Sequence, residues 1–125
     1  MKAILLVDHG SVRNEANEML VDMAQLVQRM TGNDVIVRYA HMELAEPTIA
    51  EGFANCVEAG ANEVIVFPYM LSPGRHSTTD IPRMVNAAAA NHPGVTFSVT
   101  PPFGIEEKLG EIILARAHLS AESPA

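Results

Sequence analysis

The chain has a single cysteine, no tryptophan, and no apolar run long enough to cross a bilayer. With only Cys56 available, neither an intrachain disulfide nor a cysteine-ligated iron–sulfur cluster can form within one chain. The first residues lead directly into a strand-like run with no small-residue cleavage site, so we expect no signal peptide. These features together favour a reducing compartment, and we expect a cytoplasmic protein.

Basic residues are also scarce. The 8 Lys and Arg residues face 15 Asp and Glu residues, which gives a formal net charge of −7. A chain this acidic is poorly suited to non-specific contact with nucleic acid or with anionic membranes. We therefore expect neither as a partner.

Several nucleotide and hydrolase motifs are missing. No Gly-x-x-x-x-Gly-Lys-Ser/Thr loop is present, and no Gly-x-Gly-x-x-Gly follows the first strand-like run. No Gly-x-Ser-x-Gly elbow is present either, so Ser11 is a weak candidate for a nucleophile. These absences argue against ATP-driven chemistry, dinucleotide binding and serine hydrolysis.

Short apolar runs alternate with segments of helical periodicity. Such runs are typical of parallel strands covered on both faces. The alternation predicts an α/β fold of order βαβαβαβα, with a four-stranded parallel sheet and helices on both faces. We expect one domain over residues 1–125, with a flexible tail at 120–125. The predicted strands are Lys2–Val7, Asp34–Tyr39, Glu63–Pro68 and Val95–Thr100.

Four helices are expected between and after these strands. The second is predicted to begin at Pro47 and end at Gly60, and the third to be capped by Ser77, Thr78 or Thr79. Apolar residues at helical spacing predict the buried side of the first helix: Ala16, Met19, Leu20, Met23, Leu26, Val27 and Met30. The corresponding residues of the fourth helix are Leu109, Ile112, Ile113 and Leu119.

Three candidate metal ligands follow three successive predicted strands. His9, Glu43 and His76 each lie in a connection that leaves the carboxyl end of a strand. In an open parallel sheet these connections meet at one edge, where ligands bind. Two imidazoles and a carboxylate can hold a divalent metal and leave coordination positions open. The sequence therefore predicts a metal site at this edge of the sheet, with Glu43 as ligand or proton acceptor.

Other residues of the same connections have less certain roles. His41 is equally compatible with a structural role and with the wall of a site. Three arginines are expected near the same edge of the sheet, where they would attract carboxylates or phosphates: Arg13, Arg38 and Arg75. Two methionines, Met42 and Met70, are interpreted as pocket lining.

Four ordered motifs resemble the sirohydrochlorin chelatase family of the small CbiX/SirB type. The resemblance spans nearly the whole chain, and the ordered set is more specific than any one fragment. The motifs are Leu5-Leu6-Val7-Asp8-His9-Gly10-Ser11, His41-Met42-Glu43-Leu44-Ala45-Glu46-Pro47, Leu71-Ser72-Pro73-Gly74-Arg75-His76 and Asp80-Ile81-Pro82.

The resemblance implies a metal chelatase, a lyase that needs no nucleotide and no permanently bound cofactor. Its substrates would be the tetrapyrrole sirohydrochlorin and Co²⁺ or Fe²⁺, on the way to cobalamin or sirohaem. It implies a homodimer of chelatase-type domains, with His9, His76 and Glu43 as catalytic and metal-binding residues. The expected substrate-binding residues are Ser11, Arg13, Met42, Met70 and Arg75.

Two other interpretations stay open from the sequence. The first is a carrier of divalent metal without catalysis, which would bind metal but cause no spectral change in a tetrapyrrole. The second is a phosphotransfer enzyme related to histidine phosphatases, which Asp8 disfavours because it would repel phosphate beside His9. Cobalt and iron are not distinguished, because both accept imidazole and carboxylate ligands.

Overall fold

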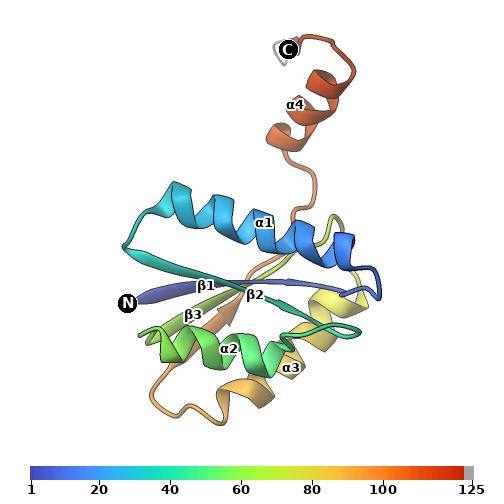
Figure 1. Cartoon of the computed structure of the whole chain (residues 1–125). Coiled ribbons are helices and arrows are strands. Elements are labelled where there is room, and N and C mark those ends of the chain that lie inside the picture. Colours follow the sequence, from blue (N-terminus) through green and yellow to red (C-terminus); the bar gives the residue numbers. More distant parts are fainter. Residues whose placement is uncertain (123–125) are drawn as a thin grey trace.

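Four parallel strands form one sheet in the order β2-β1-β3-β4 in the computed structural model, which describes residues 1–122 (Figure 1). The fold class predicted from the sequence is confirmed. The strands are β1 (Lys2–Asp8), β2 (Val35–His41), β3 (Glu63–Pro68) and β4 (Thr96–Val99).

Strand β1 lies at the centre and pairs with both β2 and β3. The register joins Asp8 to His41 at the end of β1–β2, and Val7 to Pro68 at the end of β1–β3. The carboxyl ends of these three strands are therefore level with one another. We call this edge, with the connections that leave it, the rim.

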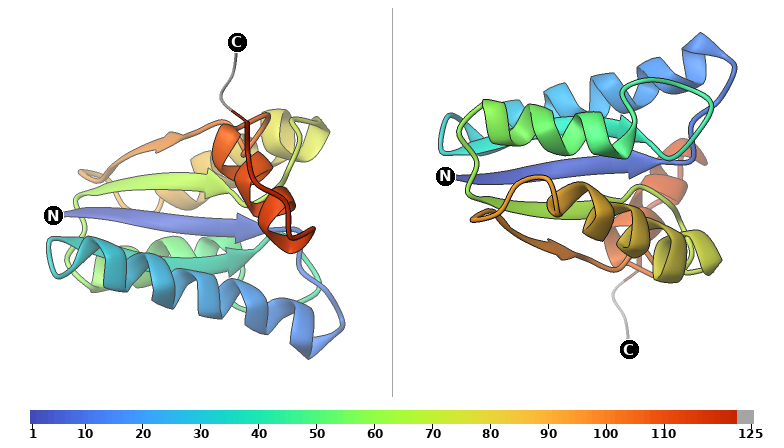
Figure 2. Two further views of the ribbon diagram at one scale, coloured as in Figure 1. Left: turned by 90° about the horizontal axis from the view of Figure 1, so that it is seen from above. Right: turned by 90° about the horizontal axis from the view of Figure 1, so that it is seen from below.

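Helices cover both faces of the sheet (Figure 2). On one face lies α1 (Asn14–Thr31), which contacts β1 and β2. On the other face lie α2 (Ile49–Glu58) and α3 (Ile81–Ala89), which pack against each other. The predicted start of α2 at Pro47 is early, because Thr48 forms a capping box with Glu51 and places the first helical residue at Ile49.

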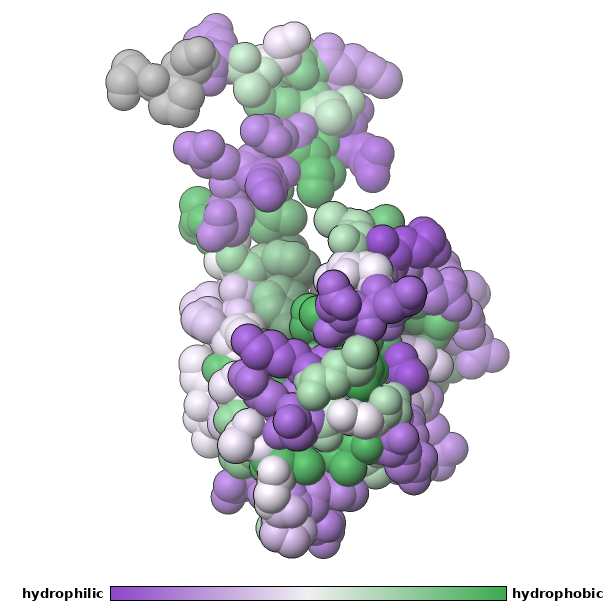
Figure 3. Space-filling view, turned by 90° about the vertical axis from the view of Figure 1, so that its left-hand side faces the viewer, coloured by the Kyte–Doolittle hydropathy of each residue, from purple (hydrophilic) through white to green (hydrophobic). Residues whose placement is uncertain are grey.

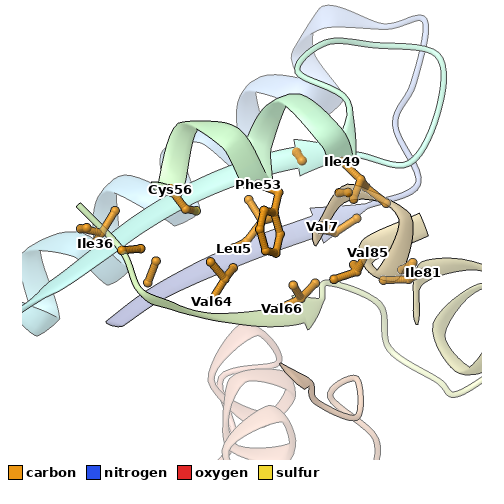
Figure 4. Packing of buried hydrophobic residues seen from close by; sticks show 14 of the residues in the cluster. Leu5, Val7, Ile36, Ile49, Phe53, Cys56, Val64, Val66, Ile81 and Val85 are labelled. Atoms are coloured by element: carbon orange, nitrogen blue, oxygen red, sulfur yellow. The ribbon is translucent and has the colours of Figure 1, made fainter. Parts of the chain in front are cut away.

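The larger core cluster lies between the sheet and the α2–α3 layer (Figure 4). Strands β1 and β3 contribute Leu5 and Val66, which meet the fully buried Phe53 of α2. Cys56 lies in the same cluster as a small apolar side chain. Burial raises the pKa of its thiol to about 11, and the positive charge of Arg38 only partly opposes this effect.

The predicted buried side of α1 is wrong in part. Leu20 and Ala24 are buried, and they pack with Leu6 and Val37 in a second, smaller core cluster. Met30, in contrast, is 76% exposed. The contact is narrow because a single helix crosses this face of the sheet, so the outer residues of the apolar stripe stay in solvent.

The predicted burial of the fourth helix is also wrong. Helix α4 (Glu107–Arg116) has no buried residue, and Ile113 is 68% exposed. Figures 1 and 3 show α4 projecting from the body on the α1 side of the sheet. The preceding segment contains Pro101 and Pro102, which favour extended backbone and lead the chain away. Three of the four residues of strand β4 are exposed, so this strand provides little buried surface against which α4 could pack.

Part of the expected flexible tail lies outside the described residues. Residues 120–122 belong to no helix or strand, and 123–125 are not described. Within residues 1–122, no helix combines the length and apolar character needed to cross a membrane.

Candidate functional site

Two of the predicted ligands meet on the rim. His9 follows β1 and His76 follows β3, and their ring centroids lie 4.7 Å apart with the ring planes at 90°. Both rings line a hollow of about 380 Å³, whose wall also includes Tyr69, Met70 and Leu71. The structure thus brings two imidazoles, 67 positions apart in sequence, to one open cavity.

The connection after β1 is held against the end of β2 by the carboxylate of Asp8. Its Oδ1 accepts a hydrogen bond from the backbone N–H of Gly10 at 3.0 Å and contacts Nδ1 of His41 at 2.6 Å. Beyond the strands, the backbone N–H of Glu43 donates to the carbonyl of His9 at 3.1 Å. Parallel pairing therefore continues into the rim, and it fixes the backbone on which His9 lies.

Gly10 has no room for a side chain. Its φ of +86° is unfavourable for other residues, and a Cβ there would lie 1.8 Å from the carbonyl oxygen of Glu43. The close approach of these two connections thus requires glycine.

His76 begins a π-helical turn (His76–Asp80) that leads into α3. Its Nδ1 lies 2.9 Å from Oδ2 of Asp80, one turn later. The loop before it is also fixed, because the N–H of Gly74 donates to Oγ of the buried Ser77 at 3.0 Å. Ser77 was expected as a helix cap, and the structure instead places it inside this turn. Single π-helical turns are frequent at functional sites.

Glu43 is exposed on the connection next to His9. Within residues 1–122, no three or more His, Cys, Asp or Glu side chains form a group able to hold a metal ion. The observed arrangement is thus a pair of histidines with a neighbouring acidic residue, and the metal-binding role of all three stays a prediction.

A family model described as CbiX matches residues 3–119. The chain belongs to the CbiX family. It is 44% identical over 110 residues to the chloroplastic sirohydrochlorin ferrochelatase of Arabidopsis thaliana, covering 88% of this chain and 48% of that protein. It is 32% identical to a sirohydrochlorin cobaltochelatase of Priestia megaterium, covering 98% of this chain and 40% of the relative. The chain thus spans about half the length of these relatives.

Solved structures agree with this membership. The sirohydrochlorin chelatase SirB from Bacillus subtilis subspecies spizizenii, in complex with cobalt, superposes with a TM-score of 0.85 at 31% identity. That match covers 94% of this chain and 50% of the other. A CbiX protein from Marinobacter aquaeolei, described as a putative cobalamin biosynthesis protein, matches with a TM-score of 0.76 at 29% identity, covering 94% and 95% of the two chains.

Of the five residues expected to bind substrate in this CbiX chain, three face the hollow or the solvent and two are engaged in other contacts. Met70 lines the hollow, and Arg13 and Arg75 are exposed at the starts of α1 and of the π-helical turn. Met42 instead packs within the core at 9% exposure, and Ser11 uses its Oγ to accept from the N–H of Arg13 at 3.0 Å.

Arg38 does not reach the rim, contrary to expectation. It lies within β2, in register with Leu5, and its guanidinium donates to the carbonyl of Val37 at 2.9 Å. Strand β2 extends to His41, two residues beyond its predicted end at Tyr39. Arg38 therefore lies within the strand and not beside the connection that follows it.

Two carboxylates, those of Asp8 and Asp80, have histidine partners that the sequence alone does not reveal. Each lies beside Nδ1 of a histidine, Asp8 with His41 and Asp80 with His76. The spacing of four residues between His76 and Asp80 was a usable signal, because side chains at this spacing share one helical face. His41 is 1% exposed, so its ring is a buried structural group within the rim.

The connections at the rim carry exposed apolar side chains, one of which, Leu71, lines the hollow with the histidine pair. Each of the four connections that leave the rim presents one large apolar residue to solvent. These residues are Val12, Leu44, Leu71 and Ile105, between 64% and 103% exposed.

Replacing Gly10 should disrupt the rim far more than replacing a glycine in open space. We expect Gly10→Ala to lower the free energy of unfolding by about 3 kcal/mol or more, from strain at positive φ and the clash with Glu43. Gly60→Ala is the control: its φ is +111° but no atom lies within 4 Å of the added Cβ, so about 1–2 kcal/mol is expected. Urea unfolding measures both, and equal losses would contradict a tight contact at Gly10.

Proposed function

We propose that this protein inserts Co²⁺ or Fe²⁺ into sirohydrochlorin without a nucleotide. The observation that carries the proposal is the pair of imidazoles, His9 and His76, with ring centroids 4.7 Å apart over an open hollow. The names of the relatives support the substrate, since they describe cobaltochelatases and ferrochelatases of sirohydrochlorin. Membership of the CbiX family supports the same reaction class.

In this proposal His9 and His76 hold the incoming metal as neutral imidazoles. The metal is a substrate that must leave the protein, so a small ligand set suits the task better than a closed site. Insertion replaces two pyrrolic protons of the macrocycle, and these protons need an acceptor. Glu43, whose backbone pairs with that of His9, takes this role or serves as a third ligand.

The rim offers complementary surfaces for a tetrapyrrole. Exposed apolar side chains such as Leu71 suit the flat faces of a macrocycle. Arg13 and Arg75 would pair with its peripheral carboxylates, and so oppose locally the repulsion from a chain of net charge −7. Imidazole and carboxylate ligands bind both Co²⁺ and Fe²⁺. The metallated sirohydrochlorin would therefore serve either cobalamin or sirohaem synthesis.

We also propose that the protein works in a reducing compartment such as the cytoplasm. Cys56 is the only cysteine, and it is buried in the core with the pKa of its thiol raised to about 11. A thiol in this state is a packing group that needs no disulfide partner.

We propose further that two copies associate through α4. The helix has no buried residue, and it exposes Ile112 and Ile113. Relatives such as the cobalt-bound SirB are about twice as long, and this chain covers 50% of that structure. A second copy would supply a second domain and an apolar surface to cover α4.

Removing either histidine should abolish most of the catalysed insertion. We expect His9→Ala and His76→Ala each to lower the insertion rate at least about tenfold, followed by absorbance with sirohydrochlorin and Co²⁺ or Fe²⁺ and corrected for the spontaneous reaction. His118→Ala, beyond the end of α4, is the control. A wild-type protein that binds Co²⁺ but never alters the tetrapyrrole spectrum would favour a carrier instead.

Glu43→Gln separates the two roles of the acidic residue. We expect insertion to slow at least about tenfold, because the amide cannot take a proton. Co²⁺ affinity, measured by titration calorimetry, should stay unchanged if Glu43 is the base and should fall in parallel if it is a ligand. Unchanged insertion would remove Glu43 from the mechanism.

A charge on the apolar side of α4 should separate the two copies. We expect the wild type to show twice the chain mass of 13.5 kDa in light scattering, and Ile113→Asp to show the mass of one chain. Met30→Asp is the matched control, since Met30 is an apolar residue on α1 with a similar exposure, 76% against 68% for Ile113. A monomeric wild type, or a dimer that survives Ile113→Asp, contradicts this contact.

A further inference from the structure

The hydrogen bond between His76 and Asp80 determines which ring nitrogen of His76 is free. Nδ1 lies 2.9 Å from Oδ2 of Asp80. An ionised carboxylate only accepts hydrogen bonds, so in contact with one Nδ1 would be the ring nitrogen that carries the proton. The lone pair of the neutral ring is then on Nε2, the nitrogen away from the carboxylate.

We propose that Asp80 is a positioning residue for His76, which holds the ring in the Nδ1–H tautomer and presents Nε2 as the metal ligand. This inference rests on the proposed function, because it assigns how one of the two histidines receives the metal. A carboxylate bonded to the far nitrogen of a ligating imidazole fixes its orientation and raises its basicity.

The local contacts of Asp80 fit this task. Asp80 precedes α3, yet its side chain makes no capping hydrogen bond to the helix. Its other oxygen, Oδ1, lies 3.7 Å from the guanidinium of the exposed Arg83. The two oxygens therefore have different neighbours, and Oδ2 is the oxygen that contacts Nδ1 of His76.

The two histidines of the pair are held differently. Within residues 1–122, no hydrogen bond is made to the ring of His9, which contacts His76 edge to face. His76 is thus the oriented ligand, and His9 is the ligand whose ring can adjust. His41 and Asp8 form a similar pair at 2.6 Å, but His41 is 1% exposed whereas the side chain of His76 is 46% exposed. Only the His76 pair can meet a metal from solvent.

A purely structural pair would behave differently. Both partners are accessible to solvent, with 46% and 24% of the side chains exposed, and an exposed pair four residues apart adds little to stability. Loss of Asp80 should therefore leave the melting temperature nearly unchanged while it alters the tautomer and the metal affinity. This separation makes the proposal testable without any measurement of insertion.

The test uses the full chain with Co²⁺ alone as the probe. We expect Asp80→Ala to weaken Co²⁺ binding about 10- to 100-fold in titration calorimetry. In alkaline solution, ¹⁵N NMR of the ring nitrogens should show His76 in the Nδ1–H form in the wild type and as a mixture of both forms in Asp80→Ala. Asp80→Glu, which restores a carboxylate, should recover much of the affinity and of the tautomer.

Two control variants complete the experiment. Asp22→Asn removes an exposed carboxylate of α1, and Arg83→Ala removes the guanidinium beside Asp80 but leaves the bond to His76. Both should retain the wild-type tautomer and affinity. If Asp80→Ala leaves either the tautomer or the Co²⁺ affinity at the wild-type value, the proposal is overturned. A wild type that binds no Co²⁺ would instead reject the proposed function, while the tautomer measurement would still report on Asp80.

Discussion

The contacts of the Asp8 carboxylate hold together the part of the molecule on which the site depends. One oxygen joins the N–H of Gly10 to the buried ring of His41, and so ties the connection after β1 to the last residue of β2. A buried imidazole is costly unless its polar atoms are satisfied, and an accepting carboxylate satisfies one of them. With this junction in place, His9 and Glu43 lie on adjacent paired backbones. The carboxylate thus adds a side-chain link to the backbone hydrogen bond between Glu43 and His9.

The rest of the site follows from the parallel sheet. Because β1 is central and in register with both β2 and β3, three connections leave the sheet at one level. At the opposite end of the strands the connections are short, over residues 32–34, 59–62 and 90–95. Glycine at position 10 then lets the first two connections approach to van der Waals distance. Strand order thus brings His9 and His76 together, and backbone stereochemistry determines how closely their loops pack.

The sequence predicts most of this arrangement, and its failures have physical causes. The strands were predictable because short apolar runs bounded by turns are a local signal, and the meeting of His9 with His76 followed from parallel pairing. The exposure of α4 was not predictable, because periodicity reveals an apolar side of a helix but not the surface that covers it. The burial of Met42 was not predictable either, because a residue at the start of a connection can turn into the core or towards the hollow. The histidine–carboxylate pairs depend on side-chain directions, which a linear pattern does not contain.

The proposed metal insertion places opposite demands on the metal ligands, since the metal must bind and then leave. A closed site of four well-oriented ligands would keep the ion, because each fixed ligand lowers the free energy of the bound state. Two freely moving imidazoles would bind it too weakly to organise insertion. In the proposed function, an oriented His76 beside a less constrained His9 would lie between these limits: one nitrogen would define where the ion sits, and the other could move as the macrocycle takes over coordination. The asymmetry between the two histidines arises from a single carboxylate four residues along the same turn. It is a feature that the proposed transfer would favour.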